Sequence, residues 1–173
     1  MIGKRHEYVL DLSRPRPTAL QTPSLKDDTS AALPVHADRL AVLMLDAYRG
    51  SIDYQDETLT DAVAEVEAYF GGRRGGPALP DHSRLAWSDS QLAAACLVAQ
   101  WDARQCPFIA YVMTHPQWKN QGLARHLLGA VLQELRSSHR EVRAIVTEGN
   151  TPSERLFRGM LFQRVEPFAQ QVD

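Results

Sequence analysis

The loop at residues 119–124, Lys-Asn-Gln-Gly-Leu-Ala, has the composition of an anion-binding helix start. The first N–H groups of a helix lack intrahelical partners, so a tightly curled loop can turn them toward one phosphate. Gly122 lets a ligand approach the backbone closely, Ala124 keeps a nearby position small, and Lys119 and Arg125 add positive charge. The stretch predicts a phosphate site, and a glycine that merely relaxes a turn is the alternative that it leaves open.

Composition and cysteine use narrow the classes of function. A net charge of −2 shows no basic excess, which argues against bulk binding of nucleic acid. The apolar run at 92–99 is too short to span a bilayer, and the N-terminus lacks the apolar segment of a signal peptide. Cys96 and Cys106 fit no disulfide or metal motif, and the histidines show no ligand spacing. We expect a cytoplasmic protein without a metal and without nucleic-acid or membrane partners.

The elements that must position this loop follow from the spacing of apolar residues. The predicted order is helices at 35–50 and 57–70, strands at 84–88, 90–101 and 107–114, a helix at 122–135, a strand at 141–148, a helix at 151–160 and a strand at 162–168. This order predicts an α/β domain of the α+β type. Its central sheet is mixed but mostly antiparallel, with about four helices around it.

The boundaries between elements carry further signals. Thr151 and Glu154 have the spacing of a capping box, which predicts Thr151 as the cap of the last helix. The glycine-rich stretch at 71–80 is interpreted as a flexible connection with two solvated arginines. Residues 1–34 form an irregular N-terminal arm with two candidate strands, YVLDL (8–12) and TALQT (18–22), and residues 35–173 form the single remaining domain.

Two motifs at this separation resemble the GNAT superfamily of acyl-CoA N-acyltransferases. The coenzyme-A signature of that family, Gln/Arg-x-x-Gly-x-Gly/Ala, opens a helix after a strand, and here it stands as residues 119–124 after His115-Pro116. The second motif has an asparagine after the next strand, a small residue three positions on, and two aromatic positions. In this sequence its positions are Asn150, Ser153, Leu156-Phe157 and Leu161-Phe162.

The resemblance implies a GNAT-like fold with acetyl-CoA as co-substrate, held where a bulge splays strand 107–114 from the next strand. The residues whose backbone would pair with the pantetheine arm are Val112, Met113 and Thr114. The N–H groups that would hold the pyrophosphate are those of Asn120, Gln121, Gly122, Ala124 and Arg125, with Lys119 as a cation at the rim. The residues that would line the far side are Asn150, Ser153 and Phe157.

The groups that would move protons are less well defined by the motifs. Many family members carry a tyrosine at position 157 as the proposed acid for the departing thiolate, and Phe157 cannot donate a proton. Tyr111 and Ser153 are candidate substitutes, and a thiol pKa of ~8.5 makes the thiolate a tolerable leaving group without an acid. Glu148 is the candidate base for the attacking amine. A surface carboxylate is the alternative interpretation of Glu148.

The loop at 48–58 lies where the family fold shapes the acceptor site. It offers Tyr48, Asp53 and Tyr54, which would favour a cationic amine such as a polyamine, an amino sugar or a peptide amine. The alternative is that the other acids of the loop serve only the N-terminus of the second helix.

The resemblance therefore implies an acyl-CoA-dependent N-acyltransferase, in the simplest case an N-acetyltransferase. It would move the acyl group to a primary amine by direct attack in a ternary complex. The alternative is a non-catalytic GNAT-like module that senses or binds acyl-CoA. The expected partner is a small-molecule or peptide amine, and many proteins of this type pair as homodimers.

Overall fold

The computed structural model describes residues 3–15 and 29–167. One seven-stranded sheet has the strand order β2-β3-β4-β5-β6-β1-β7, in which only the β5–β6 pair is parallel. The elements are β1 (Arg5–Asp11), β2 (Thr29–Ala31), α1 (Ala37–Tyr48), α2 (Leu59–Phe70), β3 (Arg84–Ser88), β4 (Gln91–Trp101), β5 (Cys106–Thr114), α3 (Leu123–Leu135), β6 (Glu141–Thr147), α4 (Thr151–Gly159) and β7 (Gln163–Pro167). The predicted fold class, a mixed and mostly antiparallel sheet with four helices, is confirmed.

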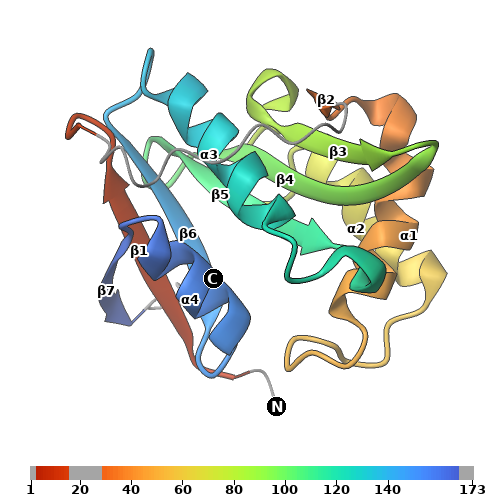
Figure 1. The fold of residues 1–173 in the computed structure, drawn as a ribbon. Helices are drawn as coiled ribbons and strands as arrows, with labels where there is room; N and C mark the ends of the chain where they lie inside the picture. The colour runs from red at the N-terminus through yellow and green to blue at the C-terminus, as the bar shows by residue number, and fades with distance from the viewer. Residues whose placement is uncertain (1–2, 16–28, 168–173) are drawn as a thin grey trace.

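The helices form two layers, one on each face of the sheet (Figure 1). The core under α3 and α4 includes Cys96 and Val98 of β4, whereas the core under α1 and α2 includes Leu97 and Ala99 of the same strand. Successive side chains of a strand point to opposite faces, so a central strand covered on both faces must be apolar at nearly every position. This explains the unbroken apolar run at 92–99, in which Cys96 is a fully buried thiol.

The N-terminal strand β1 lies inside the sheet, between β6 and β7, and is antiparallel to both (Figure 1). It corresponds to the predicted strand at 8–12, but it begins earlier, at Arg5. The short edge strand β2, which pairs with β3, was not predicted. The second predicted strand, 18–22, lies outside the described residues. The domain boundary at residue 34 stays a prediction, although β1 shares the sheet with the rest of the chain.

Strands β5 and β6 separate soon after they meet. Their pairing is limited to Phe108 with Arg143 and Ile109 with Ala144. The register between β4 and β5 shifts at the same level, because Ile109 pairs with Val98 whereas Tyr111 pairs with Leu97. An extra residue of this kind bends a strand and increases its local twist. Beyond Ile109, β5 follows β4 while β6 follows β1, so the two halves of the sheet diverge (Figure 1).

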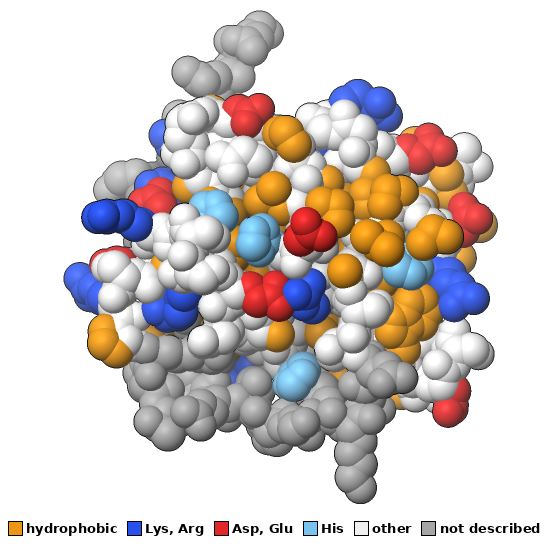
Figure 2. All heavy atoms as spheres, turned by 90° about the horizontal axis from the view of Figure 1, so that it is seen from above, with side chains coloured by type: hydrophobic (Ala, Val, Ile, Leu, Met, Phe, Trp, Pro, Cys, Tyr) orange, Lys and Arg blue, Asp and Glu red, His pale blue; other side chains and the backbone are white. Residues whose placement is uncertain are grey.

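The surface mixes apolar and charged side chains. Figure 2 shows one face on which apolar side chains gather toward one side, with both acidic and basic side chains among and around them. The most exposed large apolar residues of the described chain include Val35, Ile52 and Leu59. Ile52 lies in the loop between α1 and α2, close to Gly149 in the loop after β6. These two loops therefore meet near the part of the sheet where β5 and β6 have diverged.

Candidate active site

The loop before α3 is tightly curled. Asn120 has a φ of 63°, and Gly122, the N-cap of α3, is left-handed with a φ of 82°. A Cβ on Gly122 would meet no atom of the described residues within 4 Å, so they leave the space beside this backbone open. The N–H groups of the first helical turn lack intrahelical partners here as at any helix start. The geometry suits an anion, and binding of the pyrophosphate by this loop stays a prediction.

The two cations of this region are held against neighbouring helices. Lys119 Nζ donates to the carbonyl oxygen of Ala47 near the C-terminal end of α1, at 3.3 Å. Arg125 Nη1 lies 3.5 Å from the position that a Cβ on Gly159 would occupy, so this side chain crosses from α3 to the end of α4. The start of α3 therefore lies beside both α1 and α4.

Asn150 connects the two predicted halves of the site. Its Oδ1 accepts from the N–H of Ser153 at 3.2 Å, which makes Asn150 the N-cap of α4. The prediction of Thr151 as cap is therefore wrong by one residue, because an asparagine one position earlier has the better reach to the third N–H. Asn150 Nδ2 also donates to Asp53 Oδ2 at 2.6 Å. This bond brings a predicted cofactor residue and a predicted acceptor residue into contact.

This geometry makes a prediction about α4. Replacing Asn150 with alanine should lower the free energy of unfolding by about 1 kcal/mol, because the helix loses its cap. Thr151→Ala is the matched control and should change stability little, because the Thr151 side chain caps no helix N–H. Denaturant unfolding measures both. Equal losses for the two variants would contradict the assignment of the cap.

Phe157 lies in the core between α4 and the sheet. It is 5% exposed, and its ring lies 6.3 Å from that of Tyr8 and 5.0 Å from that of Phe162, between centroids. The Tyr8 hydroxyl is fully buried and has no hydrogen-bond partner among the described residues. Whether Phe157 lines a cofactor stays a prediction.

Glu148 lies on the β1 side of β6. Its side chain is 53% exposed, and its Oε1 lies 3.5 Å from His6 Nε2 and 4.0 Å from Arg164 Nη2. His6 is on β1 and Arg164 on β7, whereas β5 is on the opposite side of β6. The structure therefore does not bring Glu148 to the place where β5 and β6 diverge, and its role as a base stays a prediction without support from these contacts.

Tyr111 faces the other helix layer, where the sequence did not predict its partner. The Tyr111 hydroxyl donates to Glu65 Oε1 on α2, and Arg74 donates to both oxygens of the same carboxylate. Burial and the neighbouring Glu65 raise the pKa of Tyr111. Glu65 could have been noticed in the sequence because it follows Ala62 by three positions on the apolar stripe of its helix. Arg74 lies in the predicted glycine-rich connection and is 43% exposed, but its ion pair with Glu65 was not predicted.

Of the three predicted acceptor residues, Tyr48 lies between this carboxylate and that of Asp53. Burial raises the pKa of Tyr48, and the negative charges of Asp53 and Glu65 raise it further, so Tyr48 stays protonated between them. The Tyr54 hydroxyl donates to the carbonyl oxygen of Glu57 in its own loop, at 3.4 Å. The N-terminus of α2 is capped by Thr58 and Asp61, so the helix has its own capping box. The structure thus groups Tyr48, Asp53, Glu65 and Tyr111 on the α1–α2 side.

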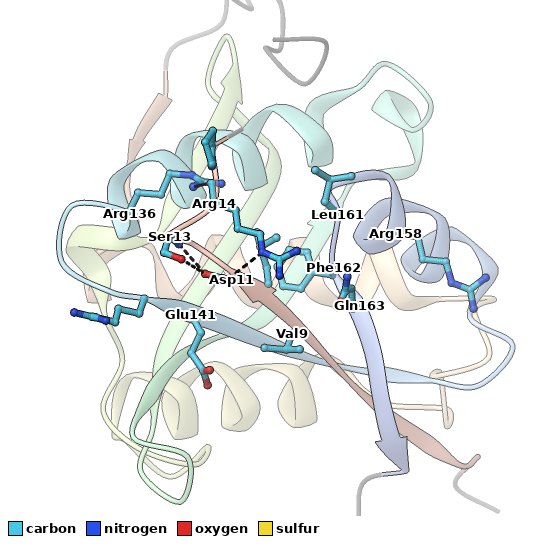
Figure 3. A pocket seen from close by; sticks show the side chains of 13 residues that line it. Val9, Asp11, Ser13, Arg14, Arg136, Glu141, Arg158, Leu161, Phe162 and Gln163 are labelled. Carbon is cyan, nitrogen blue, oxygen red and sulfur yellow. Dashed lines mark hydrogen bonds and ion pairs between the residues drawn. The ribbon is translucent and has the colours of Figure 1, made fainter. Parts of the chain in front are cut away.

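A cavity of about 730 Å³ lies elsewhere, at the end of β1 and beside β7 (Figure 3). Asp11, Ser13 and Arg14 form one of its walls, and Arg136 and Arg158 reach it from α3 and α4. None of the predicted site residues lines it. In the part of the chain that the structure describes, no group of three or more His, Cys, Asp or Glu residues could hold a metal ion. Within the same residues, no helix is both long and apolar enough to cross a membrane.

The geometry agrees with comparisons to known proteins. The sequence matches the model of the Acetyltransferase (GNAT) family over residues 44–161, and no curated protein matches it. A GCN5-related N-acetyltransferase from Sphaerobacter thermophilus is 19% identical with a TM-score of 0.66, over 95% of this chain and 49% of that one. The aminoglycoside N-acetyltransferase AAC(6')-Iy in complex with CoA is 15% identical with a TM-score of 0.62, over 88% and 99%. A tandem GNAT protein from the clavulanic acid biosynthesis pathway is 18% identical with a TM-score of 0.64, over 96% and 51%.

The sequence identity of these matches and the share of each chain that they cover determine which conclusions they support. The chain spans about half the length of two of these three structures, and at such identities the likeness shows the fold alone. The family model, in contrast, covers more than half of the chain, including both motifs around Gly122 and Asn150. The resemblance inferred from those motifs is confirmed, and the chain belongs to the GNAT family of acetyltransferases.

Proposed function

We propose that the protein transfers an acetyl group from acetyl-CoA to a primary amine. The observation that carries this proposal is the divergence of β5 from β6 beside the left-handed start of α3. Val112, Met113 and Thr114 pair with β4 on one side and have no strand partner on the β6 side among the described residues. An extended pantetheine arm can therefore add to this edge as a strand does, with its phosphates at the helix start.

The protein's contribution to the reaction would be positioning and polarisation. A neutral amine attacks the thioester carbonyl in a ternary complex, and a backbone N–H near Met113 stabilises the negative charge that develops on the carbonyl oxygen. The amine proton leaves through water, because Glu148 lies on the far side of β6. The thiolate departs without a side-chain acid, which its pKa of ~8.5 allows near neutral pH.

The acceptor would be a small-molecule or peptide amine that carries positive charge. Asp53 and Glu65 lie on the α1–α2 side of β5, and Asp53 is bonded across to Asn150 at the start of α4. An ammonium group would be attracted to these carboxylates before it loses its proton. One structural neighbour with a similar fold is named as an aminoglycoside acetyltransferase, which is also an enzyme for an aminated substrate.

Thermal unfolding with and without acetyl-CoA tests the first step. At ~100 times its Kd, a ligand stabilises a protein by about 2.7 kcal/mol. For a chain of this size that corresponds to a rise in Tm of about 5–10 °C. Thiol release from acetyl-CoA with a panel of amines then tests transfer. Stabilisation with amine-dependent release supports the proposal. Stabilisation without release indicates a binding module, and no stabilisation contradicts both.

A further inference from the structure

The acceptor side of the proposed site contains a cation that the chain itself supplies. Arg74 Nε donates to Glu65 Oε1 at 2.7 Å, and Arg74 Nη2 donates to Glu65 Oε2. The Tyr111 hydroxyl donates to the Oε1 that also receives Arg74 Nε. The planar guanidinium thus bonds both oxygens of the carboxylate, and a phenol from β5 shares Oε1 with it. Glu65 has both of its oxygens occupied.

The position of Tyr111 ties this ion pair to the proposed site. Tyr111 belongs to the part of β5 that has left β6, directly before Val112. Tyr48, at the end of α1, lies within the electrostatic influence of both Glu65 and Asp53. The Glu65 carboxylate is therefore bonded to the segment of β5 along which the proposed site places the thioester.

The ion pair between Arg74 and Glu65 is accessible to solvent and can be broken by a ligand. The side chains of Arg74 and Glu65 are 43% and 30% exposed. Arg74 lies in a connection in which Gly72, Gly75 and Gly76 all have positive φ. The backbone of this connection is itself held, because the Gly75 carbonyl oxygen accepts from the Asp102 N–H at 3.0 Å, so the ion pair opens by rotation of the Arg74 side chain. An exposed ion pair of this kind contributes only ~0.2–1 kcal/mol, which an incoming ligand can replace.

The charge state of Glu65 suits binding of a cation. Burial raises its pKa, but hydrogen bonds from Arg74 and Tyr111 more than offset this and hold the pKa below its usual value. The carboxylate is therefore ionised at neutral pH, where it is a weak base but a good anchor for positive charge.

We propose that Glu65 selects acceptors that carry a second positive charge besides the reacting amine, and that the Arg74 guanidinium occupies the place of that charge until the acceptor arrives. The substrate class is an aliphatic diamine or polyamine, whose second ammonium displaces Arg74 and donates hydrogen bonds to the same carboxylate of Glu65. This inference rests on the proposed acetyl transfer and adds its specificity-determining residue.

A matched pair of variants tests the role of Arg74. Arg74→Ala removes the guanidinium from Glu65, whereas Arg73→Ala removes the same charge from a neighbour for which no bond to Glu65 occurs. The probes are α,ω-diamines of three to six carbons and the monoamines of equal length, with thiol release from acetyl-CoA as readout. Arg74→Ala should raise kcat/KM for the best diamine about three- to fivefold, where fivefold is about 1 kcal/mol, the upper end of what such an ion pair contributes. The monoamines, and both probes with Arg73→Ala, should change less than about twofold.

Glu65→Gln provides the opposite change. It keeps the size of the side chain but removes its charge, so the preference for diamines over monoamines should disappear. Calorimetric titration of the best diamine into the CoA-saturated protein gives the same comparison without turnover. It should show tighter binding to Arg74→Ala than to the wild type and little binding to Glu65→Gln.

Two results would overturn the inference while acetyl transfer stands. The first is a lower Tm for Arg74→Ala with an unchanged ratio of diamine to monoamine activity. This result would show that Arg74 only stabilises the loop in which it lies. The second is the absence of diamine binding by Arg74→Ala in the calorimeter. If the protein does not bind CoA, the proposed function is contradicted instead. Titration of the diamine into the free protein then still tests whether Glu65 binds the second ammonium.

Discussion

Gly122→Val should weaken acetyl-CoA binding by about 100-fold, which is about 2.7 kcal/mol. A Cβ at this position meets no atom of residues 3–15 and 29–167 within 4 Å, so a side chain there would project into the open space in front of the first turn of α3. The proposed site places the pyrophosphate in that space. The φ of 82° is also strained for a β-branched residue, which should cost about 1–3 kcal/mol of stability. Calorimetry with acetyl-CoA measures the first effect, and denaturant unfolding the second.

Gly50→Val is the control that separates strain from obstruction. Gly50 has a φ of 76°, and a Cβ there also meets nothing within 4 Å in the part of the chain that the structure describes. The two variants should therefore lose similar amounts of stability, while Gly50→Val keeps its affinity for acetyl-CoA. If Gly122→Val binds acetyl-CoA as tightly as Gly50→Val does, the pyrophosphate does not lie at this helix start.

Glu7→Gln should lower the free energy of unfolding at neutral pH by about 2–3 kcal/mol, because it breaks a buried ion pair. The Glu7 side chain on β1 is 3% exposed and accepts from Arg104 at 3.0 Å and from Arg143 on β6. These contacts join the N-terminal strand to β6 and to the turn between β4 and β5. The arginines are partly exposed, at 46% and 21%, which keeps the expected loss below that of a fully buried pair.

The contribution of Glu7 should depend on pH. Burial raises the pKa of Glu7, but hydrogen bonds and charge from Arg104 and Arg143 more than offset this, so the pKa in the folded chain lies below its ordinary value of 4.5. A lowered carboxyl pKa stabilises the folded state above the ordinary value, and the stabilisation is lost as the pH falls through the folded-state pKa. The difference between wild type and Glu7→Gln should therefore be full at pH 7 and shrink below about pH 4.5.

Denaturant unfolding of both proteins across this range measures the effect. Glu67→Gln serves as the control, because Glu67 is exposed on α2 and its side chain forms no ion pair with any residue that the structure describes. It should leave stability nearly unchanged at every pH. A difference between wild type and Glu7→Gln that stays constant down to acid pH would show that Glu7 acts through packing and not through its charge.

The sequence predicted well the features that depend on neighbouring residues. The apolar stripes of α1, α2 and α3 agree with the observed helices within a few residues, because helical periodicity is a local property. Gly122 was also identified, because a residue that tolerates positive φ before a helical run has a local explanation. Thr151 was mistaken for the cap of α4 because two adjacent residues, Asn150 and Thr151, can both cap, and the chain path selected the first.

The contacts on the acceptor side could not be predicted from local sequence patterns. Tyr111 was considered as an acid and Arg74 as a solvated side chain, but both bind Glu65, which lies 46 residues from Tyr111 in sequence. No spacing rule connects a helix, a glycine-rich connection and a strand at such separations. The contact between Asp53 and Asn150 is of the same kind, because the two residues were predicted for different subsites and only the folded chain joins them.

By itself the sequence determined the type and order of most elements, the family of the chain and the helix start at Gly122. Tertiary structure alone decided that β1 enters the sheet between β6 and β7, and that β5 and β6 part after Ile109. The physical reason is that an alternating pattern specifies which face of a strand is buried but not which strand lies beside it. Neighbours are chosen by packing and charge between distant segments, such as Glu7 with Arg104 and Arg143.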